Sequence, residues 1–396
     1  MTNMPAKPPP QCNVDFFADA HLMDPVPAYH QMLETGAVLW LPKNDVYAIC
    51  GHEALTLALR NHDVFRSGFG VSIDEGVNRF LIGSTLNSDP PVHDQTRAIT
   101  FAPLTPRALK DVQARIESEA QALVNRVVAM GEIDAVSDLA THLPLAIVRD
   151  LVGLGPHGKE NMLAWAGATF ELMGDPRDRR DKARANMGAL RRFLEDPNVL
   201  RGLSPDGWAM RATRLAIDAG MPKEKAVSLM RDYIAPSLDT TISAIGYGVM
   251  LFARHPDQWE KLRSDRSLLP NAIEEIVRLN TPIKMLSRLA SEDVEIAGHV
   301  LPSESRTMMV FGAANRDPRK FENPDTFDIE RNTRGHLGFG HGVHACLGMH
   351  LARLEMRSLF TALADHVERI EITGPVEKAK NSTIHSLKRL PVRLFR

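Results

Sequence analysis

The stretch that decides the fold is FGHGVHACLG, at residues 339–348. Its glycines permit positive φ and close approach of the backbone. Apolar residues that follow fall near one helical face, at Leu347, Leu351, Leu354 and Leu363. Cys346 is therefore predicted at the start of a helix, where unpaired N–H groups and the positive end of the helix dipole stabilise a thiolate. A thiolate presented by a glycine-rich loop suits axial ligation of haem iron.

Three other interpretations of this stretch stay open. One is a buried structural cysteine. Another is a dinucleotide-binding loop, since residues 340–345 read G-x-G-x-x-A, although no convincing strand precedes them. The third is a zinc site, although zinc motifs usually pair ligands from two separated segments. Its candidate ligands are His341, His344, Cys346 and His350.

Composition excludes several classes of protein. The 396 residues carry 47 Lys and Arg against 49 Asp and Glu, a net charge of −2, which argues against nucleic acid as the main partner. The first residues hold no apolar signal segment, and the longest mainly apolar run, about 244–253, is too short to span a bilayer. We expect a soluble, cytoplasmic protein without a membrane anchor, in which Cys12 and Cys50 are core residues.

The pattern along the chain predicts one mainly α domain with small sheets over residues 15–396, after a flexible tail at 1–14. A hairpin is predicted at 38–41 and 46–50, short strands at 294–296 and 307–310, and a coil at 315–342. Residues 196–208 are expected to form a loop. Helical spacing of apolar residues covers 105–130, 136–152, 158–173, 179–195, 223–254 and 346–366.

The run F-G-x-G-x-H-x-C-x-G resembles the haem-binding loop of the cytochrome P-450 family of haem-thiolate monooxygenases. The resemblance covers residues 15–396 and implies a mostly helical fold with a small β-rich part near the N-terminus. It implies haem b as cofactor, Cys346 as the proximal thiolate ligand of the iron, and Phe339 and Gly340 among the residues that hold the haem.

Other segments match the family in the same order. Glu275-Ile-Val-Arg278 resembles the family's E-x-x-R motif, and Arg331 matches the arginine that completes its structural network. For the two haem propionates, the resemblance indicates His93, Arg97, Arg288 and His344. Arginine suits such anions because it forms charge-assisted bonds.

The oxygen-activating helix of the family corresponds to Ala235–Thr241, within the predicted helix 223–254. Asp239 and Thr240 match its acid–alcohol pair, which delivers protons. Pro236 and Ser237 replace the family's small residues. We expect Pro236 to kink the helix, because proline has no N–H, and Ser237 to add a second hydroxyl beside Thr240.

The resemblance also implies a substrate and redox partners. We expect a monomer that uses O2 and receives electrons from NAD(P)H through a ferredoxin reductase and a ferredoxin, since no flavin domain is fused to it. Arg107, Lys110 and Arg353 are candidate docking residues. Substrate contacts are predicted at Val71, Ile73, Phe170, Met173, Arg231, Ala235, Ile283, Leu286 and Ser287.

These mainly apolar residues indicate a small, largely apolar organic substrate, which Arg231 meets at a polar end. The chain looks closest to bacterial members that hydroxylate or O-demethylate small aromatic acids and methoxyarenes. A terpenoid or a fatty acid stays an alternative. Two other classes also stay open: a peroxygenase or isomerase that needs no reductase, and a non-catalytic haem sensor.

Overall fold

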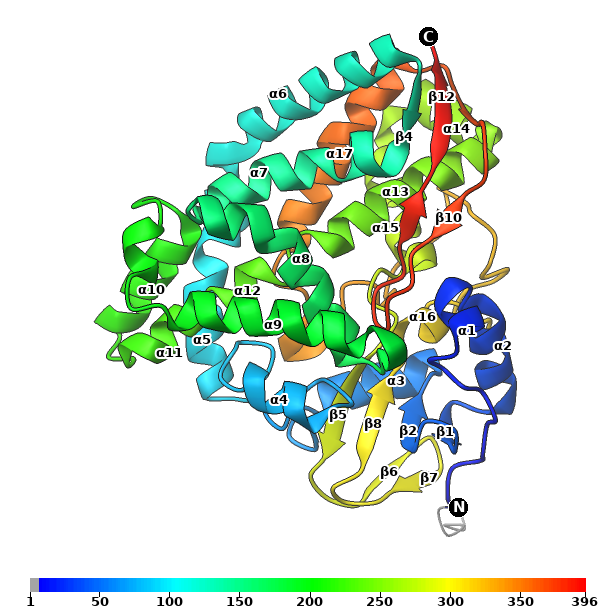
Figure 1. The fold of residues 1–396 in the computed structure, drawn as a ribbon. Helices are drawn as coiled ribbons and strands as arrows, with labels where there is room; N and C mark the ends of the chain where they lie inside the picture. Colours follow the sequence, from blue (N-terminus) through cyan, green and yellow to red (C-terminus); the bar gives the residue numbers. More distant parts are fainter. Residues whose placement is uncertain (1–6) are drawn as a thin grey trace.

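The computed structural model describes residues 7–396. Figure 1 shows a helical part that makes up most of the molecule, with β1, β2, β5 and β8 at one end and β12 at the other. The predicted fold class, mainly α with small sheets, is confirmed. One large apolar core runs through the helices, and a second, smaller core lies between the N-terminal segment, α2 and the sheet.

The α-helices are α1 Asp19–Met23, α2 Val26–Thr35, α3 His52–Arg60, α4 Glu75–Leu81, α5 Val92–Phe101, α6 Pro106–Met130, α7 His142–Val152, α8 Pro156–Met173, α9 Arg180–Glu195, α10 Trp208–Asp218, α11 Lys223–Ser228, α12 Arg231–Ile234, α13 Asp239–Arg254, α14 Pro256–Ser264, α15 Leu269–Asn280, α16 Phe311–Ala314 and α17 Met349–His366. A π-helical segment, Ala135–Ala140, precedes α7. Short 3-10 turns are Ala102–Leu104, Arg177–Arg179, Val199–Gly202, Arg266–Leu268 and Gly342–His344.

The strands are β1 Val38–Leu41, β2 Val46–Ile49, β3 Phe65–Arg66, β4 Glu132–Asp134, β5 Leu286–Ala290, β6 Val294–Ile296, β7 His299–Leu301, β8 Arg306–Met309, β9 Arg369–Ile372, β10 Glu377–Lys378, β11 Leu387–Arg389 and β12 Pro391–Phe395. The largest sheet has the order β1-β2-β8-β5-β3, in which only β2 and β8 are parallel. Strands β4, β12 and β9 form a second sheet.

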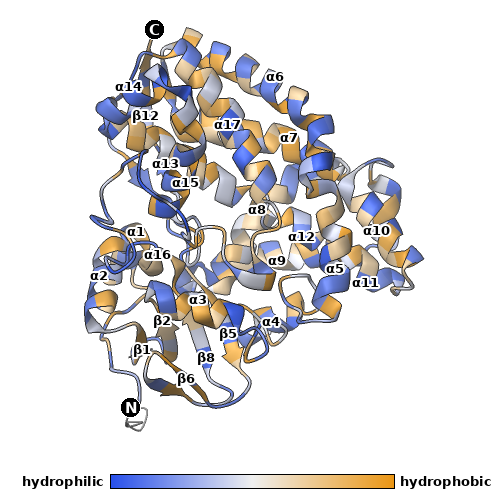
Figure 2. Cartoon of the chain, turned by 180° about the vertical axis from the view of Figure 1, so that it is seen from behind, coloured by the Kyte–Doolittle hydropathy of each residue, from blue (hydrophilic) through white to orange (hydrophobic). Residues whose placement is uncertain are grey.

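Most predicted elements lie where the pattern of apolar residues places them. The hairpin forms with Val38 opposite Ile49. Helix α6 starts after Thr105, whose hydroxyl accepts the Ala108 N–H and caps the helix. Figure 2 shows hydrophilic and hydrophobic residues alternating along α6, as expected of a helix with one face on the core. The segment 196–208 is less irregular than predicted, since it holds a 3-10 turn and α10 begins at Trp208.

The predicted flexible tail is wrong for residues 7–14, and residues 1–6 lie outside the described residues. The segment runs beside β1, where the Trp40 N–H donates to Pro10 O and the Cys12 N–H donates to Trp40 O, both at 2.9 Å. Cys12 and Val14 are buried in the smaller core. Pairing with a sheet edge and burial of apolar side chains order the segment despite its prolines.

The predicted long helix 223–254 is wrong in its continuity, because the structure divides it into α11, α12 and α13. Pro236 has no N–H to donate to the carbonyl of Asp232, so the ladder stops there. The Ser237 hydroxyl donates to the Tyr233 carbonyl instead. Helix α13 then starts at Asp239 and packs against α8, α15 and α17. The non-helical residues 235–238 therefore lie in the middle of the helical part.

Candidate active site

One cavity of about 250 Å³ collects most of the predicted site residues. Its walls come from the loop between α4 and α5, the end of α8, the break between α12 and α13, strand β5 and the cysteine loop. Cys346 lies in one wall, and Pro236, Ser237 and Thr240 also line the cavity. Several groups of polar side chains also line the cavity, and the remaining walls are mainly aliphatic and aromatic.

The cysteine loop is closed by the Cys346 N–H, which donates to Phe339 O at 2.8 Å. Two turns need positive φ, at Gly340 (68°) and Gly342 (71°), a region that glycine adopts without steric cost. A Cβ on Gly342 would also lie 2.5 Å from the Leu59 carbonyl oxygen. The loop therefore tolerates only glycine at residue 342.

Helix α17 begins at Met349, three residues later than predicted, so Cys346 precedes the helix instead of starting it. Burial raises the pKa of its thiol, while the N–H groups of Gly348 and Met349 and the charges of Arg97 and Arg353 act in the opposite direction. These are the donors and charges that stabilise a thiolate at the N-terminus of a helix. Burial outweighs these effects and the pKa is raised, so a thiolate at Cys346 requires an additional positive charge on the cavity side.

Two arginines, the half-buried Arg97 and the buried Arg288, lie beside this loop. Arg97 donates to Ala345 O at 2.8 Å, and Arg288 is 4% exposed and donates to Ser287 O. Burial lowers the pKa of Arg288 to about 10 and that of His344 to about 2. Arg97, Arg288 and His344 line the cavity, and neither arginine forms an ion pair with an acidic group in residues 7–396. Buried charges need a partner, so this wall suits an anionic group.

His93 does not line the cavity. Its Nδ1 lies 2.9 Å from Asp94 Oδ1, and its ring contacts the His344 ring with centroids 4.4 Å apart. The Nε2 atoms of both histidines are buried without a hydrogen-bond partner in the described part of the chain. Unpartnered buried nitrogens at the edge of a cavity are typical of a site that binds a polar ligand.

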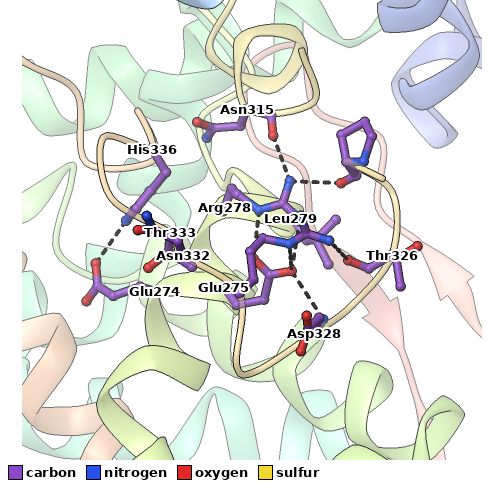
Figure 3. Close-up of polar contacts among 12 residues, drawn as sticks. Glu274, Glu275, Arg278, Leu279, Asn315, Thr326, Asp328, Asn332, Thr333 and His336 are labelled. Atoms are coloured by element: carbon purple, nitrogen blue, oxygen red, sulfur yellow. Dashed lines mark hydrogen bonds and ion pairs between the residues drawn. The ribbon is translucent and has the colours of Figure 1, made fainter. Parts of the chain in front are cut away.

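The predicted network of Glu275, Arg278 and Arg331 forms in the interior, and Figure 3 shows Glu275 and Arg278 within it. Arg278 donates to both carboxylate oxygens of Glu275, at 2.7 and 2.9 Å, and both side chains are fully buried. Arg331 Nε reaches the same carboxylate at 3.1 Å. Arg278 also donates to the carbonyl oxygens of Asn315 (2.7 Å) and Pro324 (2.8 Å). This network holds the coil that leads to the cysteine loop.

Two further parts of this support were not predicted. Asn315 accepts the Leu337 N–H at 2.6 Å, just before the loop. Glu274 binds Arg353 (2.6 Å) and His336 (2.8 Å), and although burial raises its pKa, these bonds lower it to about 2. Arg353, predicted as a docking residue, is therefore ion-paired to α15. Only the proximity of α15 to the coil brings these residues together.

On the other side of the cavity, the two hydroxyls beside Pro236 are bonded to the backbone. Thr240 donates to Pro236 O at 3.0 Å, and Ser237 to Tyr233 O. The Asp239 carboxyl does not line the cavity. It lies against Gly167 of α8, where a Cβ would be 3.4 Å from Oδ2. Burial raises the pKa of Asp239 to about 7.

The structure places six of the nine predicted substrate residues in the cavity wall: Phe170, Met173, Arg231, Ala235, Ile283 and Leu286. It corrects the other three, Val71, Ile73 and Ser287, which do not line the wall. Successive residues of a strand face opposite sides, so Leu286 and Arg288 face the cavity while Ser287 donates to Ser72 O at 2.7 Å. Val71 is buried in the large core, and Ile73 packs against the smaller core.

Several cavity residues were missed by the sequence analysis. The most notable is Asp232, which lies next to Arg231 on α12, and Ser84, Thr85 and Asn87 contribute from the loop between α4 and α5. A signal for Asp232 existed, because it forms a charged pair of neighbours with Arg231 between apolar residues, four positions before Pro236. No sequence signal singles out residues 84–87.

The alternatives for the cysteine loop gain no support. Among residues 7–396, no three His, Cys, Asp or Glu side chains come together as metal ligands, and His341 accepts from Arg60 Nε at 2.9 Å. No strand lies between α16 and the loop in the described chain, so the glycines do not follow a strand as a dinucleotide fingerprint requires.

Comparison with known proteins agrees with the geometry. A family model described as Cytochrome P450 matches residues 210–367. The cytochrome P450 CYP199A2 of Rhodopseudomonas palustris is 35% identical to this chain over 392 residues, which are 97% of this chain and 94% of the relative. The chain belongs to the cytochrome P450 family. It is thus a haem-thiolate monooxygenase, whose family uses haem b with an axial cysteine thiolate, O2 and redox partners.

Other P450s are similar over nearly the whole chain. The linalool 8-monooxygenase of Pseudomonas putida is 29% identical over 90% of this P450 and 92% of its own length. The crystal structure of P450BioI in complex with hexadec-9Z-enoic acid ligated acyl carrier protein matches with a TM-score of 0.85 and 25% identity, over 95% of this chain and 100% of that one. No helix within residues 7–396 combines the length and apolarity needed to cross a membrane.

Proposed function

We propose that this P450 inserts one oxygen atom from O2 into a small, largely apolar organic substrate, by hydroxylation or O-demethylation, with electrons from NAD(P)H through a ferredoxin reductase and a ferredoxin. The observation that carries the proposal is a mainly apolar cavity with the Cys346 sulfur in one wall and the hydroxyls of Ser237 and Thr240 in another. Product formed per NADH, with reductase and ferredoxin present, tests it.

The residues of the cavity fit a haem. Cys346 would be the axial ligand, with its sulfur beside the N–H groups of Gly348 and Met349. The unpaired Arg97 and Arg288, with the unpartnered Nε2 of His344, would hold the propionates. The bound haem supplies the iron at which O2 is bound and activated.

The chain itself controls protons and water at this site. In this structure the hydroxyls of Ser237 and Thr240 donate to Tyr233 O and Pro236 O, so each can accept a hydrogen bond from the cavity and can donate into it only by releasing its backbone bond. The non-helical residues 235–238 keep this wall open, since Pro236 prevents the helix from continuing. Asp239, buried behind this wall with a pKa near 7, can take up a proton from the α8 side and pass it on near neutral pH.

The substrate we favour is a small aromatic acid or a methoxyarene. Phe170, Met173, Ile283 and Leu286 offer apolar surface for a ring, and the similarity to a P450 at 35% identity supports a bacterial monooxygenase. A terpenoid and a fatty acid are the alternatives, since relatives named for linalool and for a ligated hexadecenoic acid share this fold. A haem sensor would bind haem without producing NADH-dependent product.

A basic groove beside the cysteine loop suits the acidic surface of a ferredoxin. Lys110 of α6 and Arg357 of α17 are exposed there, with Arg353 and His350 between them, and Arg107 lies at the start of α6. Arg353 is also bonded to Glu274. Complementary charge steers such encounters, and this groove lies on the Cys346 side of the chain, where α17 begins.

Arg97→Ala and Arg288→Ala are expected to lower haem occupancy more than substrate affinity. Each change removes a charge-assisted bond to a propionate, commonly about 1.5–3 kcal/mol. Haem per protein and the substrate-induced spin shift measure the two effects. Arg211→Ala, an exposed residue of α10, is the control. Equal haem content with lost substrate binding would show that these arginines bind the substrate instead.

Thr240→Ala is expected to keep substrate binding and NADH use but to divert part of the electrons to hydrogen peroxide. The loss is partial because Ser237 places a second hydroxyl in the same cavity, so Thr240→Ala with Ser237→Gly is expected to be severely uncoupled. Product per NADH measures this. Thr169→Val, which removes another cavity hydroxyl, is the control. Full coupling in the double variant would show that neither hydroxyl takes part in proton delivery.

Asp239→Asn is expected to slow turnover, because the relay loses its ionisable group. With a pKa of about 7, the protonated fraction of Asp239 falls tenfold per unit above pH 7. Wild-type turnover is therefore expected to decline above pH 7. The turnover of the Asp239→Asn variant is expected to show no such decline. A pH profile of the Asn variant that matches the wild-type profile would contradict this role.

A further inference from the structure

Most polar side chains of the cavity fall into three sets. Arg97, Arg288, His341 and His344 lie at the cysteine loop or beside it. A second set donates to backbone carbonyls of its own or a neighbouring helix: Thr169, Tyr233, Ser237 and Thr240. The third set joins the loop between α4 and α5 to α12, and we name it the polar corner: Ser84, Thr85, Asn87, Arg231 and Asp232.

Asp232 is the acceptor of the polar corner. Its Oδ2 accepts the Thr85 N–H at 3.1 Å. No lysine, arginine or histidine of residues 7–396 lies within ion-pair distance of this carboxyl. Burial raises its pKa, while Thr85 and the more distant Arg231 lower it. A carboxylate has about four acceptor positions, so it can still accept from a ligand in the cavity.

The guanidinium of the neighbouring Arg231 is held by hydrogen bonds to backbone carbonyls. Its Nε donates to Ser228 O (3.1 Å), its Nη1 to Phe80 O and its Nη2 to Ile82 O (3.3 Å). The guanidinium also lies over the Phe80 ring, 5.3 Å from the centroid. Three of its five N–H groups therefore serve backbone carbonyls, which leaves one N–H on each terminal nitrogen for a ligand.

We propose that Asp232 is a specificity-determining residue that accepts a hydrogen bond from a neutral donor of the substrate, a hydroxyl or an amide N–H, and that it disfavours a substrate with a carboxylate at that end. The inference rests on the proposed function and narrows its substrate class, from aromatic acids toward methoxyarenes and other substrates that carry an alcohol or an amide. A site that is built to accept a hydrogen bond rejects analogues that lack the donor, because its buried acceptor stays unpaired.

The test compares matched alcohols and acids on three scaffolds, so that it does not depend on one substrate class. The probes are 4-methoxybenzyl alcohol, 4-methoxybenzamide and 4-methoxybenzoate, geraniol and geranic acid, and decan-1-ol and decanoic acid. The dissociation constant of each is measured with the haem-loaded protein from the low-to-high-spin shift at pH 7.5. On the scaffold that binds best, we expect the alcohol to bind about tenfold more tightly than the acid.

Asp232→Asn is expected to reduce this preference about tenfold, because the amide loses the charge and can donate to a carboxylate. Asp232→Ser is the second variant, should the first not fold, with the same expected direction. Asp178→Asn, which removes an exposed carboxylate after α8, is the control and is expected to leave the ratio unchanged. The carbon-monoxide spectrum and thermal midpoint of each variant report folding.

Three results would overturn the inference. They are tighter binding of the acid than of the alcohol in the wild type, an equal change for all probes in both variants, or no spin shift with any alcohol or amide. Failure of the proposed function is distinguishable, because it would show as absence of NADH-dependent product in the reconstituted system, whatever the ratio of dissociation constants.

Discussion

Cys346→Ala is expected to lack the ferrous carbonyl band that is diagnostic of thiolate ligation and to have no monooxygenase turnover. The change removes the sulfur that the cysteine loop presents to the cavity, and no other cysteine can take its place. Cys12 and Cys50 are buried in the smaller core, and burial raises the pKa of Cys50 and keeps its thiol protonated. The carbonyl difference spectrum and NADH-dependent product formation measure the two losses.

The matched control is Cys12→Ala, which removes a small core thiol and is expected to keep both the spectrum and the activity. Haem retained with an unchanged spectrum in Cys346→Ala would eliminate Cys346 as the ligand. Stoichiometric zinc in a wild-type preparation that contains no haem would instead favour the metal-site interpretation of the loop.

Glu275→Gln is expected to destabilise the fold by about 3–5 kcal/mol, because it leaves the fully buried Arg278 without its anion. It also removes the partner of Arg331, so the coil before the cysteine loop loses one of its attachments to α15. The free energy of unfolding, measured in urea by far-UV circular dichroism and by haem absorbance, is expected to fall accordingly. A Glu275→Gln variant that accumulates only as unfolded protein would agree with a loss of free energy of unfolding near the upper end of the expected range.

Glu195→Gln is the matched control, because Arg191 and Glu195 form an ion pair of similar spacing on α9 that is exposed. Exposed pairs of this kind contribute about 0.3–0.5 kcal/mol. Arg331→Gln, which removes the outer member of the buried network, is expected to cost less than Glu275→Gln. A Glu275→Gln protein as stable as the Glu195→Gln protein would show that the buried network does not hold the coil.

The parts of the site that could be predicted are those whose chemistry is carried by local sequence. Residues 339–348 specify their own turns, since Gly340 and Gly342 adopt positive φ, and the helix that follows is amphipathic. The E-x-x-R motif predicts its own ion pair, because residues three apart share a helix face. Pro236 predicted a disturbance of the helix, although not its division into α11, α12 and α13.

The direction in which an individual side chain points, toward the cavity or away from it, could not be predicted in the same way. Ser287 and Leu286 are adjacent and both plausible as substrate contacts, yet only the pairing of β5 with β8 decides which one faces the cavity. Asp239 lies beside Thr240 in the sequence but against Gly167 in space. Such orientations depend on which distant element packs against each residue, and that partner has no signal in the local pattern.

By itself, the sequence determined the mainly helical class, the cysteine loop and the residues around it, because backbone conformation and helical periodicity depend on near neighbours. Only the tertiary structure decided the content of the cavity. It brought Thr85 to Asp232 across 147 positions and occupied Arg231 with Phe80 and Ile82. Hydrogen bonds over such separations form only when packing closes the chain, so the polarity of the substrate site is a property of the fold.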